Sequence, residues 1–309
     1  MAPLSVCVRE RPLRPDGRHA PGRRERRTYR QLRRQRHLRV QSRRRHNPGR
    51  RFEPRHLGER DARIVHHEHP RHRVLSGDGV LAKTGTGTLT LSGTNTFTGA
   101  TLVSEGTLTA GSTGALSAST ALTVDTGATF NLDAAQLVIG SLAGAGTVTT
   151  GTNALIVGVN NADTTFSGTL TNTGVAWGSD ARGTFSKTGT GTLTLESATI
   201  AGGEAYVLGG TIAISSGTTA VDYFSVGTAT TSGTPNTGTL AISGGTLNVG
   251  VALQVGDWGG NGTVNQTGGT LNIAATCGIS ANCAAINIGN QGGTGTYNIS
   301  AGTLSIQGG

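Results

Sequence analysis

Polar and apolar residues alternate with a period of two in the stretch that covers residues 83–108. Over residues 84–91, threonine at every second position alternates first with glycine and then with leucine. Successive side chains of a strand point to opposite faces, so this spacing puts hydroxyl groups on one face and small or apolar groups on the other. We therefore expect residues 84–91 to form a half-buried strand.

Residues that favour turns divide the same stretch into short pieces. The segments 92–95 (Ser-Gly-Thr-Asn) and 98–99 (Thr-Gly) tolerate a positive φ or bond to their own backbone. Short apolar runs follow at residues 102–103 and at Leu108. Strands and turns that alternate within about twenty residues are typical of one coil of a β-solenoid, which buries its apolar face only when other coils stack on it. The predicted fold class is therefore all-β.

A threonine followed by an apolar residue marks the coils along the rest of the chain. Ten such markers, spaced by 18 to 33 residues, predict roughly ten coils. At the ~4.8 Å distance between neighbouring strands, these coils would make a rod of roughly 50 Å. The apolar members of the markers are Leu89, Leu108, Phe130, Val148, Leu170, Leu193, Ile212, Leu240, Val264 and Tyr297.

Two longer correspondences support a repeat. The nonapeptide KTGTGTLTL occurs unchanged at residues 83–91 and 187–195. Its defining residues are Lys83, Gly85, Gly87, Leu89 and Leu91 in the first copy, and Lys187, Gly189, Gly191, Leu193 and Leu195 in the second. Residues 255–273 also align without gaps on 288–306 and share ten of nineteen residues. This alignment makes Asn265 equivalent to Asn298, and the two form either a side-chain amide ladder or ordinary turns.

The composition changes sharply near Leu75, which predicts two parts. Residues 1–75 contain 23 arginines, all eight histidines and seven acidic residues, giving a net charge of +16. Residues 76–309 contain three basic and ten acidic residues, giving −7, and they hold 46 of the 50 glycines. Glycine at this density disfavours helix. We expect an Arg/His-rich segment over 1–75 and the β-solenoid over 76–309.

Three interpretations of residues 1–75 stay open. The segment is a basic arm that binds nucleic acid, a disordered extension, or a stretch translated out of frame from a GC-rich gene. It has many arginines but no lysine, aromatic platform or zinc-ligand spacing, which favours the last two. A histidine cluster in it would bind metal only adventitiously: His66, His67, His69 and His72. The chain shows neither a signal-peptide pattern nor a run of about 18 apolar residues, so we expect no export signal.

Residues 83–108 resemble the autotransporter-associated β-strand repeat of bacterial type V secreted passengers. Residues 123–132 and 139–148, and the Phe-Ser-Gly at 166–168, resemble the usual continuation of that repeat. The resemblance covers about 76–309 and implies a right-handed parallel β-helix that a C-terminal membrane β-barrel carries to the cell surface. This chain lacks the alternating ten-residue strands of such a barrel. We therefore interpret it as a passenger fragment without enzymatic activity.

The residues of the solenoid offer little for catalysis. Residues 76–309 contain no histidine, which excludes a Ser-His-Asp triad and a histidine-based metal site there, and we expect no cofactor. Asp222 with Glu204, or Asp180 beside Arg182, could meet on neighbouring coils, as a glycan-cleaving enzyme with paired carboxylates would need. These acids have no recurring spacing and are more typical of solvated loops. The aromatic residues Trp177, Trp258, Tyr206 and Tyr223 are expected in the core or as caps, with sugar stacking as the alternative.

Two cysteines lie six residues apart, at Cys277 and Cys283, in the insertion that lengthens the last marker spacing. In an oxidising compartment they would suit a short disulfide loop, and otherwise they are two inert thiols. Cys7 has no evident partner in the sequence.

The leading functional hypothesis is a surface or secreted stalk used for adhesion, aggregation or display. The partners that it implies are glycans or proteins on a host or neighbouring cell, or another copy of the chain, and not nucleic acid. A third hypothesis, besides the stalk and the glycan-cleaving enzyme, is an ice-binding face made of Thr-x-Thr triplets. That hypothesis needs threonine pairs in register on nearly every coil, and the irregular marker spacing argues against it.

Overall fold

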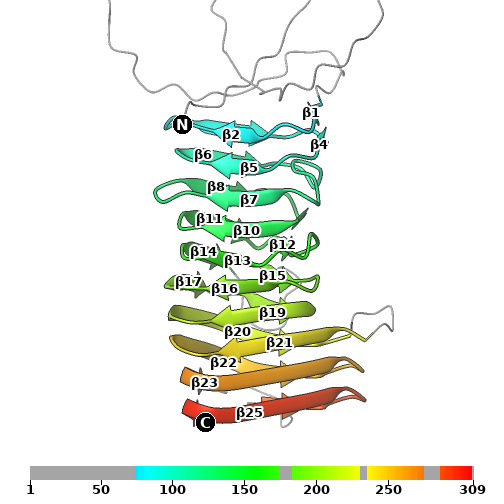
Figure 1. Ribbon diagram of the computed structural model, residues 1–309, viewed down its shortest axis with the longest axis vertical. Helices are drawn as coiled ribbons and strands as arrows, with labels where there is room; N and C mark the ends of the chain where they lie inside the picture. Colours follow the sequence, from blue (N-terminus) through cyan, green and yellow to red (C-terminus); the bar gives the residue numbers. More distant parts are fainter. Residues whose placement is uncertain (1–73, 174–182, 230–234, 275–285, 308–309) are drawn as a thin grey trace, which may run out of the picture.

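The computed structural model describes residues 74–173, 183–229, 235–274 and 286–307. These residues form a parallel β-helix, a rod of stacked coils whose two ends carry the first and last described strands (Figure 1). All pairings between its strands are parallel, each strand pairing with the equivalent strand of the next coil. The predicted all-β solenoid is confirmed.

Three faces run along the rod. Face A contains β2 (Leu81–Lys83), β5 (Thr101–Val103), β7 (Ala121–Val124), β10 (Ser141–Gly144), β13 (Thr164–Phe166), β16 (Thr192–Leu195), β19 (Gly209–Ile214), β21 (Thr237–Ile242), and the first halves of β23 (Asn261–Ile273) and β25 (Thr294–Ile306). Face B contains β3 (Thr88–Leu91), β6 (Thr107–Ala110), β8 (Thr129–Leu132), β11 (Thr147–Gly151), β14 (Thr169–Asn172), β17 (Ala198–Ala201), the first halves of β20 (Gly217–Val226) and β22 (Thr246–Val255), and the second halves of β23 and β25.

Face C has a described strand in the third to the ninth coil. It contains β9 (Gln136–Ile139), β12 (Ala154–Val157), β15 (Thr184–Lys187), β18 (Glu204–Val207), the second halves of β20 and β22, and β24 (Ile286–Ile288). At the N-terminal end, β1 (Ser76–Gly77) and β4 (Thr96–Phe97) form a separate two-stranded pair. Faces A and B each have one strand in every coil, so the described residues make ten coils, in agreement with the predicted number.

The core is a set of apolar columns that run along the inside of the rod. On face B, the inward column of the first five coils is Leu89, Leu108, Phe130, Val148 and Leu170, and all of them are buried. Burial of each such side chain contributes about 1.5–3 kcal/mol. Because every column continues through neighbouring coils, each coil depends on the next for its core.

The first predicted strand is shorter than its alternating pattern. Residues 84–87 form a turn, and the strand β3 begins only at Thr88. Gly85 has a φ of +77°, a conformation that L side chains rarely adopt, and it turns the chain from face A to face B. The predicted strand was therefore too long. Threonine and glycine alternate through residues 84–87 as they would in a strand, but these residues form a corner of the coil.

The threonine markers do not stay on one face. Leu170 on β14 pairs with Ile200 on β17, and not with the next marker, Leu193. Leu193 lies on β16 of face A, and it pairs with Ile212 on β19. The first five markers therefore follow face B and the last five follow face A, so the spacing from the fifth to the sixth marker is not the length of a coil.

Candidate functional site

The repeated nonapeptide places a buried ammonium group at a corner of the solenoid. Lys83 occupies an inward position at the end of β2, and its side chain is only 5% exposed. Its Nζ donates hydrogen bonds to the backbone oxygens of Gly85 at 2.6 Å, Glu105 at 2.9 Å and Thr84 at 3.3 Å. Burial lowers the pKa of Lys83, and the nearby Glu105 carboxylate opposes this shift. The cation thus ties two consecutive coils together through their carbonyl groups.

Lys187 repeats this arrangement in the second nonapeptide. It is 2% exposed at the end of β15, and its Nζ donates to Thr188 O at 2.6 Å and Gly209 O at 3.4 Å. Burial lowers its pKa, and here the opposing carboxylate belongs to Asp163. The leucines of both nonapeptides face the core, with exposures between 2% and 7%. The lysines and leucines of both nonapeptides therefore serve the structure of the coil.

The two nonapeptides lie at different corners of the coil. The first leads from face A, through Lys83, to face B, where it forms β3. The second leads from face C, through Lys187, to face A, where it forms β16. One sequence therefore builds the same corner at two positions around the axis.

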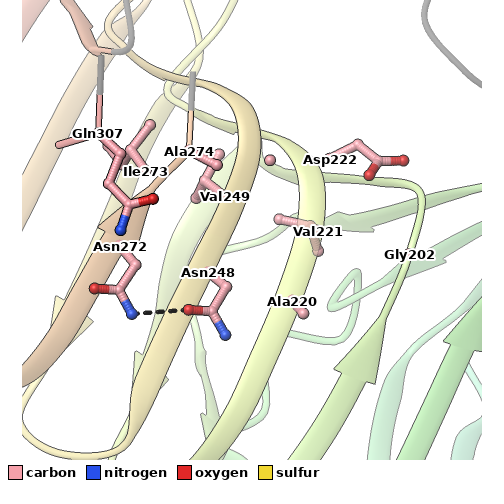
Figure 2. Close-up of a pocket in the computed structure, with 11 residues that line it drawn as sticks. Gly202, Ala220, Val221, Asp222, Asn248, Val249, Asn272, Ile273, Ala274 and Gln307 are labelled. Carbon is pink, nitrogen blue, oxygen red and sulfur yellow. Dashed lines mark hydrogen bonds between the residues drawn. The ribbon is translucent and has the colours of Figure 1, made fainter. Parts of the chain in front are cut away.

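A groove of about 500 Å³ runs along the corner between faces B and C in the C-terminal half of the rod (Figure 2). Its described lining comes from five successive coils: Gly202, Ala220, Val221, Asp222, Asn248, Val249, Gly250, Asn272, Ile273, Ala274 and Gln307. Asp222 is the only carboxylate among these residues, and none of them carries a positive charge. The groove therefore offers amide and carboxylate groups to a neutral or cationic ligand.

Two asparagines of the groove are stacked in register. Asn248 on β22 pairs with Asn272 on β23, and Asn272 Nδ2 donates to Asn248 Oδ1 at 2.9 Å (Figure 2). Neither was singled out from the sequence, although the segment GGTLN that carries them occurs at both 244–248 and 268–272. The repeated asparagine after an identical Gly-Gly-Thr-Leu was the signal that could have found them.

Of the two alternatives for Asn265 and Asn298, the structure shows the side-chain amide ladder. The two residues pair between β23 and β25, and Asn298 Nδ2 donates to Asn265 Oδ1 at 2.9 Å. The alignment of residues 255–273 with 288–306 thus corresponds to coils in direct contact.

A second polar cluster lies on the outer side of face C. Tyr206 donates its hydroxyl to Glu204 Oε2 at 2.6 Å, and its ring centroid is 6.1 Å from that of Tyr223. Burial raises the pKa of Tyr223 well above its usual value, and the carboxylates of Asp257 and Glu204 raise it further. Burial also raises the pKa of Asp257. Hydrogen bonds from the Trp258 backbone and the Asn290 side chain lower this pKa, but burial has the larger effect.

This cluster differs from the carboxylate pair predicted from the sequence. The backbones of Asp222 and Glu204 are neighbours, since Asp222 N donates to Gly203 O at 2.9 Å. Their side chains differ in environment: Glu204 is 7% exposed and bonded to Tyr206, whereas Asp222 is exposed in the groove. The carboxylates that act together on Tyr223 are those of Glu204 and Asp257.

Tyr206, Tyr223 and Trp258 are not core plugs. Tyr206 and Tyr223 are half-buried on the outer side of face C, because the inward positions beside them belong to Ala205 and Phe224. Trp258 is 63% exposed in a turn after β22, where it adopts a φ of +52°. Other predicted features lie outside the described residues: Trp177, Asp180 with Arg182, Cys277 with Cys283, and the histidine cluster.

The described residues contain neither a group of metal ligands nor a membrane-spanning helix. Within them, no three His, Cys, Asp or Glu side chains come together as ligands of a metal ion would. The same part of the chain contains no helix of the length and apolar character needed to span a membrane.

Comparison with known families gives one match. Residues 81–110 and 185–221 match the model of the passenger-associated-transport-repeat family. Over these two segments the chain carries passenger-associated-transport repeats. No curated protein and no solved structure matches it. The resemblance seen in the sequence is thereby confirmed.

The positions of the two passenger repeats agree with the geometry of the nonapeptides. Each matched segment begins two residues before the lysine of KTGTGTLTL. The first passenger repeat therefore begins on face A and the second on face C. Each passenger repeat therefore forms a corner followed by more than one coil, and the face on which it begins is not fixed.

Proposed function

We propose that this chain is part of a non-enzymatic autotransporter passenger, a β-helical stalk that acts at the cell surface or after secretion. The observation that carries the proposal is the presence of two passenger repeats within one continuous solenoid of ten coils. A solenoid gains length with each coil while its cross-section stays the same, so it can hold a binding surface away from its base. Such a rod suits adhesion, aggregation or the display of another module.

The distribution of carboxylates supports a role without catalysis. Glycoside hydrolysis needs two carboxyl groups that flank one bond in an accessible cleft. Asp222 is the single carboxylate among the described residues that line the groove. Glu204 and Asp257 both act on Tyr223 but are only 7% and 4% exposed. Neither the groove nor the cluster around Tyr223 therefore offers an accessible pair of carboxylates.

The partners that fit this proposal are surface glycans or proteins of another cell, or further copies of the chain. Repeated weak contacts along a rod gain strength from multivalency, which raises avidity by a factor of about 10² to 10⁴ without new contacts. Many copies on one surface would therefore bind a partner surface far more tightly than a single copy binds its ligand.

Beads coated with the full chain at increasing density test this proposal. We expect bead aggregation and retention on cultured cells to rise steeply with coating density, while soluble chain at the same total concentration competes weakly. A parallel assay measures new reducing ends in a panel of soluble polysaccharides. The absence of aggregation and retention at every density would contradict the stalk, and reducing ends that disappear in Asp222→Asn would show an enzyme instead.

A further inference from the structure

One outward column of face B consists of threonine in all ten coils. The pairing register joins each of these residues to the next without a break: Thr88, Thr107, Thr129, Thr147, Thr169, Thr199, Thr218, Thr246, Thr270 and Thr303. The number of residues between successive threonines varies from 17 to 32 along the chain. The corners absorb this variation, so irregular spacing in the sequence becomes a regular column in space.

A second outward column lies two residues further along the same strands. In the first five coils it consists of Thr90, Thr109, Asn131, Thr149 and Thr171. In the last five coils it changes to Ala201, Ala220, Asn248, Asn272 and Ser305. The paired columns are therefore confined to the N-terminal half of the rod, where nine of the ten outward positions are threonine.

We call these ten positions of coils one to five the threonine grid. Neighbouring strands put its rows ~4.8 Å apart along the rod, and a two-residue step puts its columns ~7 Å apart across it. The register within the grid has no bulge, since the one irregularity of the β11–β14 pairing falls after Thr149. The grid is thus a two-dimensional lattice of hydroxyl and methyl groups with one amide, that of Asn131.

The hydroxyl groups of the grid are not used by the protein. No side chain of its nine threonines makes a hydrogen bond to another described residue. All but Thr109, which is 7% exposed, are partly or well exposed to solvent. Each hydroxyl can donate one hydrogen bond and accept two, and the branched side chain is stiff at χ1, so little freedom is lost when it binds.

The chemistry of the grid excludes most ligands. It contains no charged residue, so it lacks the lysine and arginine contacts that bind phosphate groups. It contains no aromatic residue on which a sugar ring could stack. What it offers is a repeated, uncharged donor and acceptor at fixed spacing, which matches the hydrogen bonding of ordered water.

We propose that the threonine grid binds the surface of ice. Each row orders water molecules between its two side chains, and the repeat along the rod continues this order from coil to coil. The inference is independent of the stalk function, because it needs only the fold and the exposed grid. The register, and not the marker spacing, decides which threonines are aligned, and it aligns threonine pairs in four of the first five coils.

Thr129→Tyr in the full chain tests the inference, with Thr239→Tyr as the matched control. Both threonines are half-exposed, both precede a buried core residue and both lie within an outward threonine column, but Thr239 is on face A and outside the grid. The measurements are partition of the chain into a growing ice front and inhibition of ice recrystallisation. Far-ultraviolet circular dichroism at the assay temperature shows that each variant is folded.

We expect the unmodified chain to bind ice, Thr129→Tyr to lose about tenfold in potency, equivalent to about 1.4 kcal/mol, and Thr239→Tyr to retain it. Absence of ice binding in the unmodified chain would overturn the inference, and so would equal losses in the two variants. Adsorption to microcrystalline cellulose without adsorption to ice would assign the grid to a polysaccharide surface instead.

Discussion

Lys83 and Lys187 begin identical nonapeptides, yet they lie on different faces of the solenoid. Lys83 shares a column of face A with Val103, and Lys187 shares a column of face C with Val157 and Val207. Each ammonium group turns back to the carbonyls of its own corner. The shared sequence therefore encodes a corner, and it does not by itself set the position of that corner around the axis.

Replacing either lysine by methionine should destabilise the rod, and Lys83→Met should cost more. Lys83 donates to three backbone oxygens and Lys187 to two. A buried acceptor left without its donor costs about 1–3 kcal/mol. Urea unfolding followed by circular dichroism measures the loss, with Thr84→Ser at an exposed neighbouring position as the control. A Lys83→Met variant as stable as the unmodified chain would show that the corner does not need the cation.

The equivalent glycines of the two nonapeptides should differ in their tolerance of alanine. Gly85 and Gly189 have φ values of +77° and +68°, so both substitutions carry the cost of a left-handed residue, about 1–2 kcal/mol. A Cβ at Gly85 meets no atom within 4 Å, whereas a Cβ at Gly189 would lie 2.0 Å from Gly158 O. We therefore expect Gly189→Ala to lower the thermal midpoint well beyond Gly85→Ala. Equal midpoints would contradict the close contact between these coils.

Asn272→Asp should weaken the stacked pair in the groove at neutral pH. Asn272 Nδ2 donates to Asn248 Oδ1, and an ionised carboxylate cannot donate in its place. We expect a loss of about 1–3 kcal/mol that is partly recovered below pH 4, where the carboxyl group regains a proton. Asn298→Asp, in the exposed pair at the end of the rod, is the control and should cost less. A loss that does not depend on pH would argue against this hydrogen bond.

Asp257→Asn should stabilise the protein at neutral pH and not in acid. The pKa of Asp257 is raised from 3.8, so the folded state holds the proton more firmly than the unfolded state does. The stability that this provides is present below pH 3.8 and is lost as the pH rises through the folded-state pKa. Asparagine keeps the Oδ1 that accepts from Trp258 N at 3.0 Å and removes the charge.

Thermal midpoints of Asp257→Asn and the unmodified chain, measured at pH 7 and pH 3, check this expectation. The variant should melt higher at pH 7, and the difference should disappear at pH 3. Asp133→Asn, at an exposed position, serves as the control. A variant that melts lower at pH 7 would mean that the Asp257 carboxylate is needed by the cluster around Tyr223.

The sequence predicted the fold well because solenoid coils are built from local patterns. Alternation at Leu89 and Leu91 gives the inward side of a strand, and repeated segments such as those carrying Asn265 and Asn298 stack directly. The change of face between Leu170 and Leu193 could not be predicted, because a threonine followed by an apolar residue is equally suited to any face. Only the pairing of Leu170 with Ile200 reveals it.

The candidate sites were less predictable than the fold. The groove depends on the register that aligns Asp222, Asn248 and Asn272 at one corner, and register is set by contacts between coils. The threonine grid was visible in the sequence as Thr-x-Thr, but its alignment was hidden by corners of unequal length. Trp258 was expected in the core or as a cap, and it is exposed because a positive φ places it in a turn.

The distance between spin labels at Thr88 and Thr303 tests the central claim most directly. These residues are the first and last members of one column, nine coil steps apart. Labels introduced without using the native cysteines, and measured by pulsed electron resonance, should give one narrow distribution near 43 Å if each step is ~4.8 Å. A broad distribution, or a distance shorter by several coil steps, would contradict a continuous solenoid with threonine aligned in every coil.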